Sequence, residues 1–128
     1  MLRRIIAVMV LLNIFVLSAC SNAGESDVSK VLAKAQKDGK TVILELGSVG
    51  CIPCEQMKPV IQKLRETYKD TLEVLFVDVR VDRPTAVRFG VTVIPTQVFL
   101  DKKGKEFHRH VGFYDYGEIF DVLKAQGL

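Results

Sequence analysis

Two hydrophobic patterns, one typical of buried strands and one of amphipathic helices, alternate along most of this chain. Residues 41–46, 74–77 and 96–100 are largely apolar segments rich in β-branched and aliphatic side chains, the second lying within a longer segment at 71–79. Each run predicts an interior strand. Residues 101–105 contain a hairpin signal, with Gly104 at the turn position whose backbone conformation favours glycine. Residues 106–111 are therefore expected to pair back as a charged edge strand.

Apolar residues at helical spacing lie between these strands. Ser26 or Asp27 can cap a first helix that ends at Gly39. A second helix follows the strand at 41–46, and its apolar face consists of Met57, Val60, Ile61, Leu64 and Tyr68. Pro84 suits the first turn of a short third helix that runs through Phe89 and closes at Gly90.

The last helix begins at a predicted capping box, which consists of Asp115 and, three residues later, Glu118. Its inward residues are expected to be Ile119, Val122 and Leu123. The predicted order is helix, strand, helix, strand, helix, strand, strand, helix. The sequence has no repeat or low-complexity segment, so we predict one folded domain over residues 28–128.

The first 19 residues have the organisation of an export signal. Arg3 and Arg4 precede an apolar run at 5–17, which falls short of the ~20 residues that a membrane-spanning helix needs. The run ends in Leu-Ser-Ala-Cys at 17–20, which resembles the lipobox of bacterial lipoproteins. The resemblance implies cleavage after residue 19 and a lipid on the sulfur of Cys20, with residues 20–27 as the lipidated tether. An ordinary secretory signal or an uncleaved anchor is the alternative.

Net charge and cysteine content reduce the number of functions that fit this sequence. The net charge is +3, and without the two arginines of the export signal 16 basic residues face 15 acidic ones, so nucleic-acid binding is not expected. Three cysteines would leave one odd thiol in an exported protein, but acylation of Cys20 leaves the pair Cys51 and Cys54. A two-residue spacer closes too short a loop to stabilise the fold much, so the pair suits a redox couple.

The position of Cys51 favours a reactive thiolate. The residue lies between a predicted buried strand and the helix that follows it, close to the helix N-terminus. Unpaired backbone N–H groups and the positive end of the helix dipole stabilise an anion there. The thiolate is the nucleophilic form of cysteine.

Four features together resemble the thioredoxin superfamily, over roughly residues 28–126. Cys-Ile-Pro-Cys at 51–54 matches its redox motif, and Pro59 matches its helix-kinking proline. Ile-Pro-Thr at 94–96 matches its cis-proline loop, and Glu45 occupies the position of its buried aspartate. The resemblance implies an α/β, thioredoxin-like fold with a central mixed four-stranded sheet flanked by helices.

The resemblance also implies a role for each site residue. Cys51 would be the nucleophile that attacks a client disulfide, and the more buried Cys54 would resolve the mixed disulfide. Glu45 would accept the proton of Cys54, with its pKa raised toward neutrality by burial. Pro95, if cis, would keep its loop clear of the disulfide. The expected client-contacting residues are Gly50, Ile52, Pro53, Ile94 and Thr96.

Four positions depart from the family pattern. Gly50 stands where thioredoxins usually carry tryptophan, and Ile52 stands where they usually carry glycine. Glu45 is one methylene longer than the usual aspartate. Phe76 replaces a lysine that often lies near the buried acid, so Glu45 is expected to be protonated more easily.

These observations predict an extracytoplasmic thiol-disulfide oxidoreductase, anchored through lipid on Cys20 and facing the periplasm or cell exterior. We expect a monomeric reductant with no metal and no cofactor beyond the Cys51–Cys54 disulfide. Its expected partners are client proteins with disulfides, such as exported apocytochrome c, and a membrane electron-donor protein. A disulfide oxidase or isomerase is one alternative. A copper- or haem-delivery module, with His108 or His110 as a further ligand, is another.

Several residues also have simpler interpretations. Glu45 could be a solvated strand residue, Pro95 could be trans, and the cysteines could belong to an inactive thioredoxin fold. His108 and His110 are expected to be exposed on the edge strand. Lys102, Lys103 and Lys105 are expected to form a solvated turn, and core or cap packing is favoured over a client surface for Phe113, Tyr114 and Tyr116.

Overall fold

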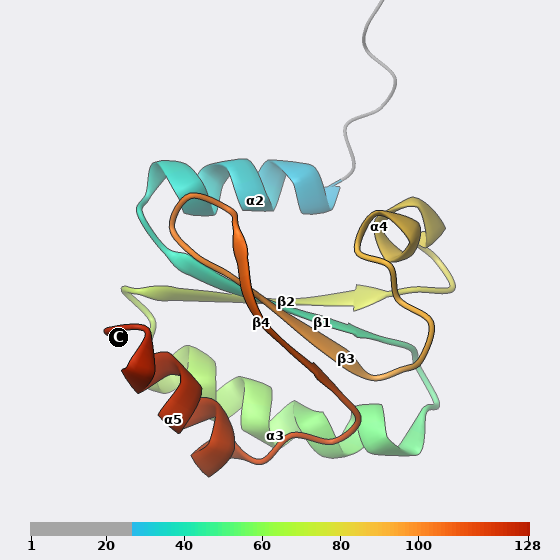
Figure 1. The fold of residues 1–128 in the computed structure, drawn as a ribbon. Helices are drawn as coiled ribbons and strands as arrows, with labels where there is room; N and C mark the ends of the chain where they lie inside the picture. Colours follow the sequence, from blue (N-terminus) through green and yellow to red (C-terminus); the bar gives the residue numbers. More distant parts are fainter. Residues whose placement is uncertain (1–26) are drawn as a thin grey trace, which may run out of the picture.

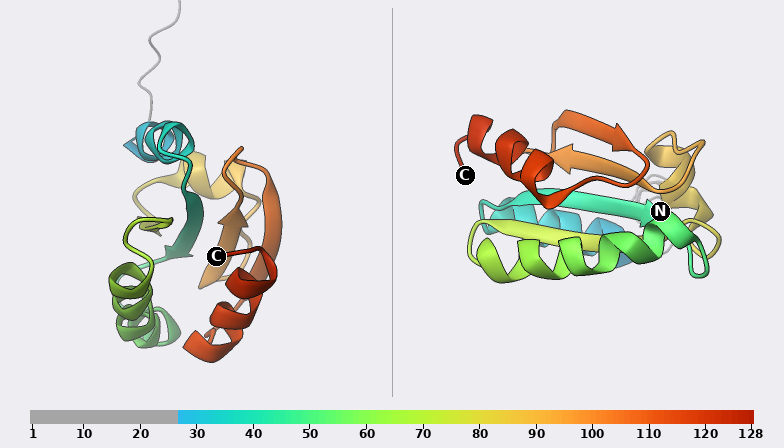
Figure 2. Two further views of the ribbon diagram at one scale, coloured as in Figure 1. Left: turned by 90° about the vertical axis from the view of Figure 1, so that its left-hand side faces the viewer. Right: turned by 90° about the horizontal axis from the view of Figure 1, so that it is seen from below.

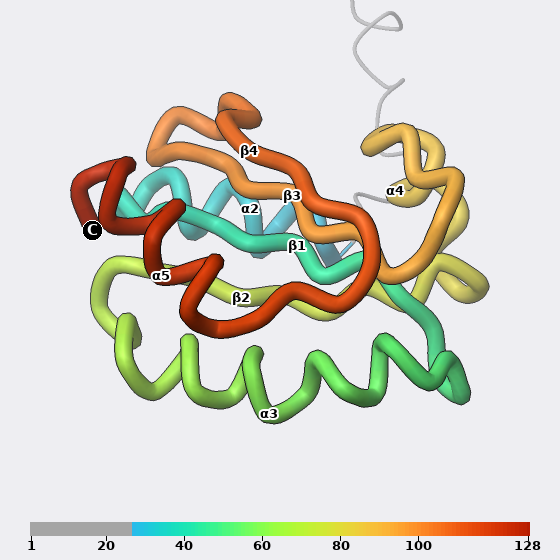
Figure 3. The backbone as a smooth tube through the Cα atoms, turned by 60° about the horizontal axis from the view of Figure 1, so that its bottom comes forward, coloured from blue at the N-terminus to red at the C-terminus, as the bar shows by residue number. Residues whose placement is uncertain are grey.

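A four-stranded mixed sheet forms the centre of the protein, for which a computed structural model describes residues 27–128 (Figure 1). The strands are β1 (Thr41–Gly47), β2 (Leu72–Asp78), β3 (Thr96–Leu100) and β4 (Glu106–Val111). Their spatial order is β2-β1-β3-β4, which the backbone trace displays side by side (Figure 3). The β1–β2 pair is parallel and the β1–β3 and β3–β4 pairs are antiparallel, so the predicted mixed sheet is confirmed.

Helices cover both faces of this sheet. α2 (Asp27–Lys37) and α4 (Arg83–Arg88) lie on one side, and α3 (Ile52–Thr67) and α5 (Tyr116–Ala125) lie on the other (Figures 1 and 2). The element order is the one that the hydrophobic pattern predicts. The capping box of α5 is present, because Asp115 accepts a hydrogen bond from the backbone N–H of Gly117 and Glu118 accepts one from that of Asp115.

Two apolar cores result, one on each face of the sheet. All seven residues of β1 are buried, and because side chains alternate along a strand, neighbours in β1 point to opposite cores. Leu44 packs in the core beneath α2, while Ile43 packs with Phe99 and α3 in the other. The same alternation places Glu45 on the α3 side, at the end of β1 where α3 begins.

The two histidines of β4 are not exposed, so that expectation is wrong. His108 and His110 are half-buried, because both lie on the face of β4 that packs beside α5 and its preceding loop. The His108 Nε2 atom lies 3.1 Å from the Tyr114 hydroxyl, and the His110 ring stacks on the Tyr114 ring at 3.8 Å. Buried Tyr114 is therefore a core residue, as expected, whereas Phe113 remains exposed.

The proposed export signal, Cys20 and most of the tether lie outside the described residues. Within residues 27–128, no helix is both long enough and apolar enough to cross a membrane.

Candidate active site

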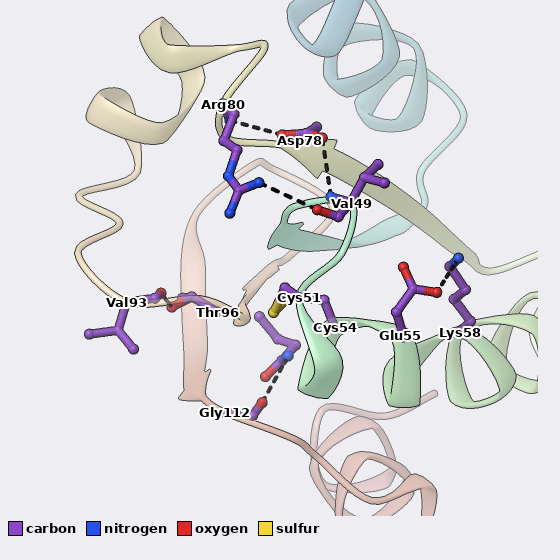
Figure 4. The surroundings of a disulfide bond; sticks show 11 residues. Val49, Cys51, Cys54, Glu55, Lys58, Asp78, Arg80, Val93, Thr96 and Gly112 are labelled. Carbon is purple, nitrogen blue, oxygen red and sulfur yellow. Dashed lines mark hydrogen bonds and ion pairs between the residues drawn. A yellow bond between two sulfur atoms is a disulfide. The ribbon is translucent and has the colours of Figure 1, made fainter.

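The cysteine pair lies where β1 ends and α3 begins. Cys51 is the N-cap of α3 and forms a disulfide with Cys54, at a Cα–Cα distance of 5.2 Å (Figure 4). Cys51 is half-exposed, whereas Cys54 is 3% exposed. The helix N-terminus therefore presents one accessible cysteine and one shielded cysteine, the asymmetry that the resemblance to thioredoxins implied.

Gly47, the last residue of β1, allows α3 to approach the sheet closely. A Cβ atom at this position would lie 3.0 Å from the Cys54 sulfur and 3.2 Å from the Phe76 ring. Two residues before the motif's helix, Gly50 has a φ of +78°, a conformation that favours glycine. Gly50 was among the residues predicted from the sequence, whereas Gly47 was not, because a steric contact between separate elements has no sequence signature.

A hydrogen-bonded brace holds the loop before Cys51 against the end of β2 (Figure 4). The Asp78 carboxylate accepts hydrogen bonds from the backbone N–H groups of Val49, at 3.3 Å, and Arg80, at 2.9 Å. The Arg80 side chain in turn donates to the Val49 carbonyl at 3.5 Å. The backbone N–H of Arg80 is the main reason that the pKa of Asp78 is lowered. The two hydrogen bonds of Val49 join segments that are distant in sequence and were not predicted from it.

The predicted cis-proline is present beside the disulfide. The Ile94–Pro95 peptide bond is cis, and the Pro95 carbonyl accepts a hydrogen bond from the Gly112 N–H at 2.8 Å. Thr96 is only 2% exposed, and its hydroxyl donates to the Val93 carbonyl at 2.7 Å. The expectation that Thr96 contacts a client therefore cannot apply to its side chain. Figure 4 shows this segment facing the cysteines.

Glu45 is buried, which rules out the solvated alternative. It is 1% exposed, and neither carboxylate oxygen has a hydrogen-bond partner in the described part of the chain. Burial raises the pKa of Glu45 to about 7, and the amide of Gln97 opposes this rise. A carboxyl group that titrates near neutrality inside the protein can exchange a proton at physiological pH.

Apolar surface surrounds the disulfide. Val49, Ile52 and Val93 are 71%, 75% and 56% exposed. Ile52, among the expected client contacts, is therefore accessible. On the α3 side, a cavity of about 440 Å³ reaches Cys54 and Phe76, with Lys58 and Arg65 also in its lining. An exposed apolar rim around a reactive sulfur fits an unfolded or extended protein segment better than a small charged molecule.

One ring nitrogen of each histidine, Nε2, is already hydrogen-bonded and is therefore not free to bind a metal. His108 pairs with the Tyr114 hydroxyl, and the His110 Nε2 atom lies 3.1 Å from the Phe113 carbonyl oxygen. Across residues 27–128, no three His, Cys, Asp or Glu side chains are grouped so that they could hold a metal ion.

Comparison with known proteins identifies the class to which this fold and site belong. A family profile described as a thioredoxin-like domain matches residues 28–127. Thioredoxin H5 of Oryza sativa is 32% identical over 101 residues, which cover 76% of this chain and 72% of that protein. Thioredoxin of Bacillus subtilis is 32% identical over 79 residues, or 62% of this chain and 75% of that one. The chain spans about half, 53%, of the chloroplastic Thioredoxin Y of Oryza sativa, at 30% identity.

Solved thioredoxin structures agree with this assignment. The Drosophila germline thioredoxin Deadhead superposes with a TM-score of 0.69 at 25% identity, covering 80% of this chain and 92% of its own. Thioredoxin NaTrxh of Nicotiana alata gives a TM-score of 0.66 at 29% identity, covering 78% and 86%. The chain belongs to the thioredoxin-like domain family. It is a thioredoxin-like oxidoreductase with a disulfide-forming Cys51–Cys54 pair.

Proposed function

We propose that this protein reduces disulfides of exported client proteins through the Cys51–Cys54 dithiol. The observation that carries the proposal is the placement of a half-exposed Cys51 at the start of α3, beside the cis-proline segment and just after the strand that carries the buried acid (Figure 4). Cys51 as thiolate attacks one client sulfur, forming a mixed disulfide and expelling the other client sulfur as a thiolate. Cys54 then attacks Cys51, which releases the second client thiol and leaves the protein oxidised.

In this proposal Glu45 accepts the proton that Cys54 loses. Because the pKa of Glu45 is raised to about 7, the carboxylate is a usable base near neutral pH and a stronger one than an exposed glutamate. The released proton then passes to solvent. Two electrons move from the dithiol to the client in each cycle, so a donor must reduce the Cys51–Cys54 disulfide again. A membrane electron-donor protein is the proposed source.

Trapping of the mixed disulfide tests the assignment of the two sulfurs. We expect Cys54→Ser to accumulate a covalent complex with a disulfide-bonded client, because the resolving thiol is missing, and Cys51→Ser to form none. Non-reducing gel electrophoresis with insulin or a mixed exported extract measures both. Complex formation by Cys51→Ser alone would reverse the assignment.

The reduction potential decides the direction of the reaction. A value near that of thioredoxin, about −270 mV, would support a reductant that a donor recharges. A value near about −120 mV would make the protein a disulfide-forming oxidant instead. Equilibration of the full-length chain with glutathione buffers, followed by quantification of free thiols, gives the number.

Lipid attachment at Cys20 is the proposed means of anchoring. The supporting observation is the sequence Leu-Ser-Ala-Cys at 17–20 directly after the apolar run of an export signal. We expect radiolabelled palmitate to label the native chain in a bacterial host, and Cys20→Ala to abolish the label and release the domain from membranes. Labelling that survives in Cys20→Ala would contradict this assignment.

A further inference from the structure

Gln97 of β3 lies directly opposite Glu45 across the centre of the sheet. The two are register partners in the antiparallel β1–β3 pair, so their side chains lie on the same face, with Cβ atoms of such pairs typically about 4.5–5.5 Å apart. Gln97 is 0% exposed and Glu45 is 1% exposed. The buried acid therefore has a buried amide as its nearest cross-strand neighbour on this side, whereas its partner on β2 is apolar Phe76.

The hydrogen bonds of this pair are incomplete. The Gln97 Nε2 atom donates to the Gly112 carbonyl at 3.2 Å, which leaves its second hydrogen available. The Gln97 Oε1 atom and both carboxyl oxygens of Glu45 have no protein partner within residues 27–128. Burial of unpaired oxygens is costly, and an aliphatic side chain at position 97 would avoid the cost of the amide.

We propose that Gln97 is a positioning residue that partners Glu45 in both of its protonation states and links Glu45 to the cis-proline loop. An ionised carboxylate accepts hydrogen bonds, and the second hydrogen of the Gln97 Nε2 group can supply one. A protonated carboxyl needs an acceptor for its O–H, and the Gln97 Oε1 atom can provide it. One amide thus offers the acid a donor when it is ionised and an acceptor when it is protonated.

The connection to the cis-proline loop runs through Gly112. Gln97 binds the Gly112 carbonyl, and the Gly112 N–H donates to the Pro95 carbonyl at 2.8 Å. Ionisation of Glu45 draws on the same Nε2 group that holds Gly112. A change of charge in the interior is therefore transmitted, through two hydrogen bonds, to the segment beside the disulfide.

Few titratable groups lie on the elements that pack around Glu45 and Gln97. On β4, the register partner of Gln97 is His110. The His110 ring stacks on Tyr114, and its Nε2 atom is hydrogen-bonded to the Phe113 carbonyl. α3 contributes the cysteines themselves and, in the lining of the cavity beside Cys54, the charged residues Glu55, Lys58 and Arg65. Burial raises the pKa of Glu45 and the Gln97 amide lowers it, and no charged side chain of the described residues contributes to the shift.

Direct titration of Glu45 tests the inference. Only the expected effect of Gln97 on the reaction rate rests on the proposed function of Glu45 as a base. The full-length chain with ¹³C-labelled glutamate would be titrated by NMR as the native protein and as Gln97→Met, which keeps the length but removes the polar atoms. We expect the Glu45 pKa to rise by about half to one pH unit in Gln97→Met, because a hydrogen bond to the charged form is lost. Gln97→Leu serves if the methionine variant does not fold.

Val98→Ala is the matched control. Val98 is the next residue of β3 but packs in the opposite core beneath α2, so its truncation should lower stability and leave the Glu45 titration in place. A Glu45 pKa in Gln97→Met that is unchanged, or that moves no more than in Val98→Ala, would overturn the proposal. In the native chain the Gly112 ¹³C carbonyl shift should titrate with the same midpoint as Glu45, and this response should vanish in Gln97→Met. A Gly112 response that persists would refute the link to the loop.

A double-mutant cycle separates this inference from the proposed function. If Gln97 acts through Glu45, Gln97→Met should move the acid limb of the disulfide-reduction rate to higher pH in the native background but change nothing further in a Glu45→Gln background. Absence of disulfide reduction by the native chain would disprove the proposed function. The NMR titration would still decide the role of Gln97. An additional rate loss in the Glu45→Gln background would show that Gln97 acts by another route.

Discussion

At the scale of single residues, Glu45 makes stability depend on pH near neutrality. Its pKa is about 7 in the folded protein because burial disfavours the charge, and it returns toward its ordinary value of 4.5 on unfolding. The folded state therefore holds more protons than the unfolded state between these two values. Stability from this group is fully present below about pH 4.5 and is lost as the pH rises to about 7.

Replacement of Glu45 by glutamine should remove this dependence. We expect Glu45 by itself to lower the free energy of unfolding by about 3 kcal/mol between pH 4.5 and 8, so the difference in stability between Glu45→Gln and the native protein should change by about that amount over this range. Guanidinium denaturation at several pH values measures both. Glu66→Gln, at an exposed glutamate of α3, is the control and should keep the native slope. An equal slope in native protein and Glu45→Gln would show that Glu45 does not titrate in this range.

At the scale of elements, the site depends on how closely the start of α3 approaches the end of β1. Gly47 permits this approach, and the brace between Asp78 and the Val49–Arg80 segment fixes the loop that joins the two elements. The cis-proline segment before β3 lies on the other side of the cysteines. The reactive sulfur is thus positioned by three separate segments and not by the Cys-Ile-Pro-Cys motif alone.

Gly47→Ala tests the importance of this approach. The new methyl group would lie 3.0 Å from the Cys54 sulfur and 3.3 Å from its Cβ atom, so α3 must shift by a few tenths of an ångström. We expect a loss of about 1–3 kcal/mol in stability, typical of overpacking, together with a changed reduction potential. Chemical denaturation and glutathione titration provide the two measurements.

Gly117→Ala is the matched control, since Gly117 lies in the first turn of α5, where a Cβ atom would meet only the Asp115 carboxylate. It should leave the reduction potential unchanged. An unchanged potential in Gly47→Ala as well would mean that the close packing of Gly47 has no bearing on the redox couple.

At the scale of the whole molecule, we expect the fold to persist without the disulfide. Cys54 is buried, but neither of the two hydrophobic clusters on the faces of the sheet includes a cysteine, and the bond joins residues only three positions apart. We expect reduction to lower the free energy of unfolding by about 2 kcal/mol, as a short closed loop implies, and to preserve a single cooperative transition. Denaturation with and without dithiothreitol measures the difference. Loss of cooperativity on reduction would show that the bond is a structural staple.

The sequence by itself determined the order of the elements, the class of fold and the redox pair. Short apolar runs and the helical spacing of apolar residues record which segments meet the core, and this pattern is local. The same is true of the capping box at Asp115 and of Cys51 at the start of a helix. Resemblance to thioredoxins then pointed correctly to a buried Glu45 and to the cis bond at Pro95.

Tertiary structure alone decided the contacts between segments distant in sequence. The pairing of Glu45 with Gln97, the fit of Gly47 against Cys54 and the brace at Asp78 each join different elements, so no spacing along the chain records them. The partial burial of His108 and His110 likewise depends on Tyr114, which arrives from the loop before α5. Local patterns report which face of an element is buried, whereas the packing of elements determines which groups meet there.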